Sequence, residues 1–161
     1  MSYISSEGLS WRGVLKGFPK AINIMQPLFE AFTNSLEAID MRKRQGDIFL
    51  PYIHLDFYFN HTTENENDGL TRLSITDNGI GFDNENFNRL KVFKDDSKGD
   101  GNKGSGRIQF IQFFTTATYE SVYRQDGTYK LRRFVLSKAE SFLRQNSILR
   151  LDEERELDNN S

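Results

Sequence analysis

A β-hairpin signal in the second half of the chain constrains the fold more than any other feature. Residues 118–124 and 128–136 alternate between apolar and polar side chains, and Gln125-Asp126-Gly127 separates the two runs. Asp-Gly between alternating runs favours a tight turn, because the central residues of such a turn adopt positive φ angles. We therefore predict two antiparallel strands here.

The rest of the chain shows helical and extended patterns in turn. A helix is expected to begin near Pro27, in whose first turn a proline costs nothing, and to bury one stripe of side chains. The stripe consists of Leu28, Phe32, Ser35, Leu36 and Ile39. Further strands are indicated at residues 51–59 and 70–76, and further helices at 84–93 and 107–117. This order predicts an α+β fold, a two-layer sandwich.

Composition excludes several classes of function. The chain has no cysteine, which removes disulfide frameworks, cysteine nucleophiles and thiolate zinc sites. Its two histidines, His54 and His61, are too few for a histidine-rich metal centre. A net charge of −2 does not favour binding to a nucleic acid.

The length and the ends of the chain predict one soluble domain. The 161 residues suit a single domain, expected over 1–151, and the acidic, polar stretch 152–161 is expected to fray. No apolar run reaches the length of about 18 residues that a membrane span needs. The first residues lack the charged and apolar regions of a secretory signal, so a cytoplasmic location is expected.

The first candidate motif lies on the helix that begins near Pro27. Glu30, Asn34 and Glu37 fall within a stripe about 60° wide on a helix of 3.6 residues per turn. A carboxylate can take a proton from water, and an amide oxygen can bind a hard cation such as Mg²⁺. Taken alone, these residues also fit an ordinary solvated helix face.

The second and third motifs are rich in glycine. Asp77-Asn78-Gly79-Ile80-Gly81-Phe82 places a carboxylate at the end of a strand, and its glycines let a ligand approach the backbone. Residues 98–107 carry Lys98, Lys103 and Arg107 and lead into a helix whose N-terminus suits a phosphate. A Rossmann site is excluded because no strand precedes this loop, and a Walker A loop because Gly-Lys-Ser/Thr does not occur. Alone, the motifs also fit a capped turn and a surface loop.

The three motifs in this order resemble the nucleotide-binding domain of the GHKL superfamily. That superfamily includes gyrase, the ninety-kilodalton heat-shock chaperones, histidine kinases and MutL. Residues 30–38 resemble its N-box, Asp77 to Gly81 its Asp-x-Gly-x-Gly box, and residues 103–107 the box that closes the ATP lid. The third box resembles those of bacterial chaperone-like and MORC-like ATPases more than that of gyrase. The resemblance implies a Bergerat fold, with a mixed, mostly antiparallel sheet and helices on one face.

The resemblance also implies a role for each residue. Asp77 would bind the adenine amine, and Asn34 would bind a Mg²⁺ ion that bridges the phosphates of ATP. Glu30 would activate the attacking water. The remaining residues implied at the nucleotide are Glu37, Gly79, Gly81, Phe82, Lys98, Lys103, Gly104, Ser105, Gly106 and Arg107, and a lid would span about 83–106.

Hydrolysis is preferred over transfer of phosphate to histidine, because neither histidine lies on an expected helix. The expected activity is a Mg²⁺-dependent ATPase, slow as an isolated domain, that binds ATP and ADP. Two departures from the family are a missing Gly-Thr strand to support Asp77 and a missing downstream transducer lysine. They keep open a nucleotide-gated interaction module without turnover. The chain is expected to be the N-terminal part of a larger protein, for whose full length an ATP-dependent homodimer is one option.

Overall fold

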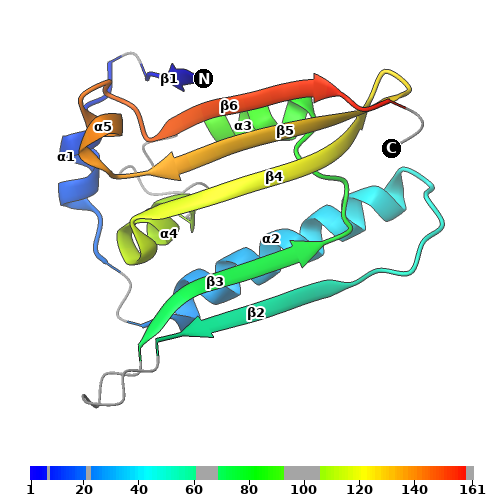
Figure 1. The fold of residues 1–161 in the computed structure, drawn as a ribbon, viewed down its shortest axis with the longest axis horizontal. Coiled ribbons are helices and arrows are strands. Elements are labelled where there is room, and N and C mark those ends of the chain that lie inside the picture. Colours follow the sequence, from blue (N-terminus) through cyan, green and yellow to red (C-terminus); the bar gives the residue numbers. More distant parts are fainter. Residues whose placement is uncertain (7, 21–22, 61–68, 93–105, 159–161) are drawn as a thin grey trace. The chain divides into compact units, whose positions relative to one another are not determined.

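The computed structural model describes residues 1–6, 8–20, 23–60, 69–92 and 106–158. These residues form an α+β fold, as predicted, and Figure 1 shows its helices and strands. The chain divides into two compact units. The first unit comprises Met1–Leu28 and Gly81–Ser161, and the second comprises Phe29–Ile80. The chain therefore leaves the first unit after Leu28 and returns to it at Gly81.

The first unit contains a four-stranded antiparallel sheet in the order β1-β6-β5-β4. Its strands are β1 (Ser2–Ile4), β4 (Thr116–Gln125), β5 (Thr128–Ser137) and β6 (Leu149–Glu156). The predicted hairpin is confirmed: β4 and β5 pair up to Gln125 and Thr128, and Asp126 and Gly127 have φ angles of 52° and 85°. Positive φ at both turn residues explains the Asp-Gly signal.

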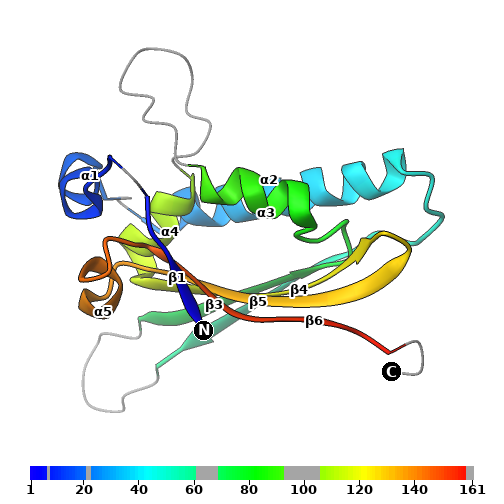
Figure 2. The ribbon, with the colours of Figure 1, turned by 90° about the horizontal axis from the view of Figure 1, so that it is seen from above.

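Helices and aromatic side chains complete the first unit. The helices are α1 (Trp11–Gly17), α3 (Asn84–Lys91), α4 (Gly106–Phe114) and α5 (Glu140–Leu143). Helices α3 and α4 lie on the same face of the sheet (Figure 2). Phe134 of β5 is fully buried; it contacts Phe87 of α3 and stacks on Tyr119 of β4 at 4.5 Å between ring centroids.

The second unit combines one long helix with a two-stranded antiparallel sheet. Helix α2 (Met25–Arg44) begins four residues before the unit does, and β2 (Ile53–Phe59) pairs with β3 (Leu70–Asp77). Every strand pair among the described residues is antiparallel, in two separate sheets. The expected mixed sheet is therefore not found in this part of the chain.

The buried stripe predicted for α2 is partly wrong. Ser35 and Ile39 are buried, but Leu36 is 48 % exposed. The buried face instead turns toward the small side chain of Ala38, because the main chain at Gly79 and Ile80 packs directly on the helix there. A large side chain at position 38 would hold the two backbones apart, so this contact needs a small residue. The spacing of large apolar residues therefore did not predict it.

The expectation that residues 152–161 fray is wrong for the first five of them. Strand β6 continues to Glu156 and pairs with β5 along this stretch. The acidic residues lie opposite basic ones: Glu153 opposite Arg133, Glu154 opposite Arg132, and Glu156 opposite Lys130. Pairing of opposite charges across two strands stabilises a segment that looks unstructured when its own composition is considered alone.

Across the described residues, no helix combines the length and the apolar character needed to cross a membrane.

Candidate functional site

Asp77 lies at the end of β3, and both of its carboxylate oxygens are held by hydrogen bonds within the second unit. The Ser35 hydroxyl on α2 donates to Oδ2 at 2.7 Å, and the Gly79 amide donates to Oδ1 at 2.9 Å. An ionised carboxylate has about four acceptor positions, so each oxygen can still accept a bond from a ligand. The two bonds fix the direction of the carboxylate and leave it able to bind a donor.

The turn that follows Asp77 is docked on α2. The Ile80 amide donates to the Ala38 carbonyl at 2.9 Å, and a Cβ added to Gly79 would lie 2.6 Å from Ala38. Any side chain at residue 79 would therefore push the turn off the helix. The first glycine of the motif is required by packing within the protein, whatever else it does for a ligand.

A second anchor of this turn is Asn78. The Arg42 guanidinium of α2 donates to the Asn78 carbonyl at 2.7 Å. The Asn78 side chain accepts from the Tyr52 amide at 3.0 Å and donates to the Leu50 carbonyl at 2.8 Å. Ser35, Ala38 and Arg42 are spaced three and four residues apart, so one face of α2 supports the whole turn.

The predicted carboxylate and amide of α2 lie on the adjacent part of the helix surface. Glu30 is half-buried, whereas Asn34 and Glu37 are exposed. Burial raises the pKa of Glu30, and the negative charge of Glu37 raises it further. A carboxylate with a raised pKa is a stronger base, which suits proton abstraction from water.

Gly81 and Phe82 belong to the first unit, where they pack on β4. Gly81 has a φ angle of +76°, and a Cβ there would lie 2.5 Å from the Val122 carbonyl oxygen. The Phe82 amide donates to the Ser121 hydroxyl at 2.8 Å, and the Phe82 ring contacts those of Tyr119 and Phe134. The side chain of Phe82 is thus occupied in the core of this unit, and its contact with a nucleotide stays a prediction.

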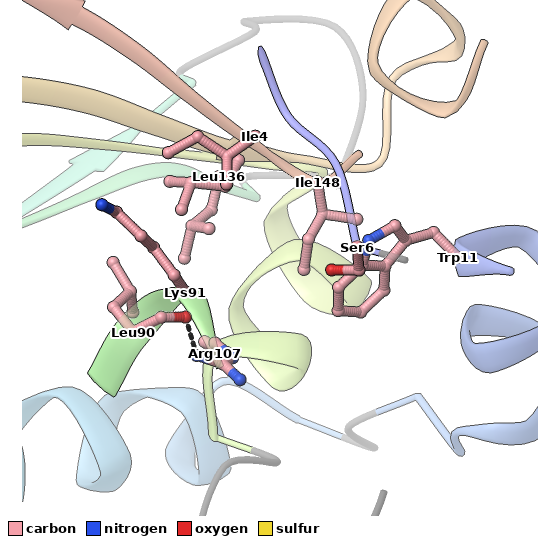
Figure 3. A pocket seen from close by; sticks show the side chains of 9 residues that line it. Ile4, Ser6, Trp11, Leu90, Lys91, Arg107, Leu136 and Ile148 are labelled. Carbon is pink, nitrogen blue, oxygen red and sulfur yellow. Dashed lines mark hydrogen bonds between the residues drawn. The ribbon is translucent and has the colours of Figure 1, made fainter. Parts of the chain in front are cut away.

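Gly106 and Arg107 begin helix α4, and both are buried. The Arg107 guanidinium donates to the carbonyl of Leu90 at the end of α3 (Figure 3). It also donates to the carbonyl of Val92, at 2.8 Å. Burial lowers its pKa. The Arg107 guanidinium, which the sequence predicts to bind phosphate, is therefore directed at the C-terminal carbonyls of α3. Such an arrangement stabilises the end of a helix.

Lys98, Lys103, Gly104 and Ser105, with residues 93–105 of the expected lid, lie outside the described residues. In the described ranges, no three histidine, aspartate or glutamate side chains cluster closely enough to hold a metal ion. A cation at this site would need ligands such as the Asn34 amide and groups that a substrate brings.

A small pocket in the first unit borders Arg107. Its volume is about 260 Å³, and this figure includes open solvent. Figure 3 shows its mostly apolar lining, which includes Ile4, Trp11 and Leu136. Among the predicted site residues, only Arg107 lines it, so we assign it no ligand.

Sequence reasoning missed the residues that hold the Asp77 turn from outside. Arg42 gave no signal of its own, because an arginine near a helix C-terminus is common on solvated surfaces. Ser35 was expected to be buried, but its bond to Asp77 was not foreseen.

Comparisons with protein-family models, with curated proteins and with solved structures find no match to this chain.

Proposed function

We propose that this chain is a Mg²⁺-dependent ATP-binding and ATP-hydrolysing module of the GHKL type, located in the cytoplasm. The observation that carries the proposal is the Asp77 carboxylate, oriented by Ser35 and Gly79 and still able to accept a hydrogen bond. A fixed acceptor of this kind suits the exocyclic amine of adenine, because a charge-assisted bond is about twice as strong as a neutral one.

The α2 residues supply the remaining chemistry in this proposal. Asn34, one turn after Glu30, offers an amide oxygen to Mg²⁺, which takes most of its other ligands from phosphates and water. Glu30, with its raised pKa, accepts the proton of the water that attacks the γ-phosphate. The released products are ADP and inorganic phosphate. Turnover by this domain alone is expected to be slow.

Calorimetry with a non-hydrolysable ATP analogue tests the binding step. Asp77→Ala should lower the affinity about tenfold to a hundredfold, because a hydrogen bond to a charged group is worth about 1.5–3 kcal/mol. Asp40→Ala is the matched control, since Asp40 is an exposed carboxylate on α2 that pairs with Arg44. Equal affinity in the parent and in Asp77→Ala would overturn the assignment.

The metal and the catalytic base need separate measurements. Asn34→Ala should weaken binding in Mg²⁺ but leave binding in EDTA unchanged. Glu30→Gln should keep the affinity and lower the rate of phosphate release about 10²- to 10⁴-fold. A parent chain that binds the analogue tightly but releases no phosphate from ATP would replace the hydrolase by a nucleotide-gated interaction module.

A further inference from the structure

Two arginines donate to main-chain carbonyls on either side of the point where the chain crosses between the units. In the second unit, Arg42 donates to the carbonyl of Asn78 at 2.7 Å. In the first unit, Arg132 of β5 donates to the carbonyls of Phe82 and Asp83 at 2.6 Å and 3.0 Å. The crossing itself lies between Ile80 and Gly81. A guanidinium therefore binds the main chain at each end of the segment that contains Gly79 and Gly81.

Arg132 is held with little freedom to move. Its side chain is 2 % exposed, its Nε donates to Glu154 at 2.8 Å, and its Nη2 donates to the Asn84 side chain at 2.7 Å. The guanidinium also lies over the rings of Phe87 and Tyr123, at 4.4 Å and 4.5 Å from their centroids. A buried charge is tolerated only where it is paired and hydrogen-bonded, so this network fixes the carbonyls that it binds.

Arg42 makes the same kinds of contact within the second unit. It pairs with Asp47 at 2.9 Å, and its guanidinium lies 4.2 Å from the centroid of the Phe49 ring. Each arginine thus has a carboxylate partner, an aromatic ring and a loop carbonyl. Because both bind main-chain atoms, neither depends on the side chain at the position that it holds.

We infer that Arg42 and Arg132 are positioning residues for the Asp77 loop, defined as residues 77–83. A loop with two glycines has many accessible conformations, and a ligand that must order such a loop loses affinity. Arg42 stabilises the main chain at Asn78 within the second unit, and Arg132 stabilises it at Phe82 and Asp83 within the first unit, before a ligand arrives. The consequence for nucleotide affinity depends on the function proposed above, whereas the effect on the loop does not.

Arginine-to-lysine variants with matched controls separate this role from general stability. A lysine keeps the charge, but its compact ammonium cannot reproduce the fork that serves a carboxylate and a carbonyl together. The test variants are Arg42→Lys and Arg132→Lys. Their controls are Arg44→Lys on the same helix and Arg133→Lys on the same strand, which change arginines paired with Asp40 and with Glu120 and Glu153.

The first measurement is amide hydrogen exchange in the nucleotide-free protein, well below its melting temperature. Arg42→Lys should speed exchange at Gly79 and Ile80, and Arg132→Lys at Phe82, by about tenfold, since one charge-assisted bond is lost. The Leu55 amide in β2 and the two control variants should be unaffected. Unchanged exchange at the loop amides would overturn the inference.

The second measurement is the affinity for the ATP analogue at the same temperature. We expect a loss of about threefold to tenfold in both test variants and none in the controls. Faster exchange with parental affinity would overturn the link to binding. A parent chain that binds no analogue would refute the proposed function, and the exchange data would still decide the role of the arginines. If Arg132→Lys does not fold, Asn84→Ala removes one acceptor of the same fork at an exposed position and should speed exchange at Phe82.

Discussion

Glu30 shows at the scale of one residue how the property proposed for catalysis can conflict with stability. Its pKa is raised by burial first and by the charge of Glu37 second. A raised folded-state pKa means that the ionised carboxylate is less favourable in the folded chain than in the unfolded chain. The contribution of Glu30 to the free energy of unfolding is therefore fully present below the unfolded-state pKa, near 4.5. It is lost as the pH rises through the folded-state pKa.

Glu30→Gln should therefore raise the melting temperature at neutral pH, because glutamine occupies the same space without the charge. The difference from the parent should disappear below about pH 4, where the carboxyl is protonated in both states. Thermal melts of the two proteins between pH 3.5 and pH 7 would measure this. Asp40→Asn, which changes an exposed carboxylate of α2 that pairs with Arg44, is the control and should not raise the melting temperature at neutral pH.

Ser35→Ala should weaken both the fold and the proposed site. Ser35 is 4 % exposed and donates to Asp77, so its loss leaves one carboxylate oxygen with fewer partners. We expect a loss of about 1–2 kcal/mol in the free energy of unfolding, measured by urea titration. Thr33→Ala removes an exposed hydroxyl from the same helix and should cost much less. Equal losses in the two variants would contradict the role of the Ser35–Asp77 bond.

At the scale of secondary-structure elements, the contact between α2 and the Asp77 turn depends on the absence of side chains. Gly79→Ala would place a Cβ 2.6 Å from the Ala38 backbone and side chain. We expect a loss of about 1–3 kcal/mol or more in the free energy of unfolding, because two backbones must separate. Gly17→Ala, whose added Cβ has open space around it, should change the free energy little. Denaturant melts of the two variants would compare them.

The β5–β6 pair gives a prediction about the last strand. A chain that ends at Asp152 lacks Glu154 and leaves Arg132 buried without its carboxylate. The truncated chain loses this ion pair, in which Glu154 is 41 % exposed, and also the pairing of residues 153–156 with β5, so it should melt below a chain that ends at Asp158. Circular dichroism melts of the two chains would test this. Equal melting temperatures would mean that β6 contributes little beyond Asp152.

At the scale of the whole molecule, local sequence patterns predicted individual helices and strands better than the pairing between strands. The hairpin around Asp126-Gly127 and the helix that begins near Pro27 were predicted because their signals lie within a few residues. Strand β1 has only three residues and is stabilised by β6, so no local pattern could indicate it. The end of β6 was missed for the same reason, since its acidic residues need the basic residues of β5.

In the candidate site, too, the residues with a local sequence signal were predicted and those without one were not. The helix face with Glu30 and Asn34, and the strand-end carboxylate of Asp77, follow from spacing and from an apolar strand followed by glycine. The guanidiniums of Arg42 and Arg132 could not be placed, because each binds main-chain atoms that are distant in the sequence. The position of an arginine along the chain does not reveal which carbonyl it will reach.

The division of the chain into a continuous unit and an interrupted one has a consequence for the order of folding. The second unit is complete once Ile80 has been synthesised, and its strands β2 and β3 are close in sequence. The first unit cannot close until residues near position 150 exist, because Ser2 pairs with Leu151. Domains form from the N-terminus during synthesis, and distant pairings close slowly. On the ribosome, the second unit should therefore form before the segments that flank it in the sequence can meet.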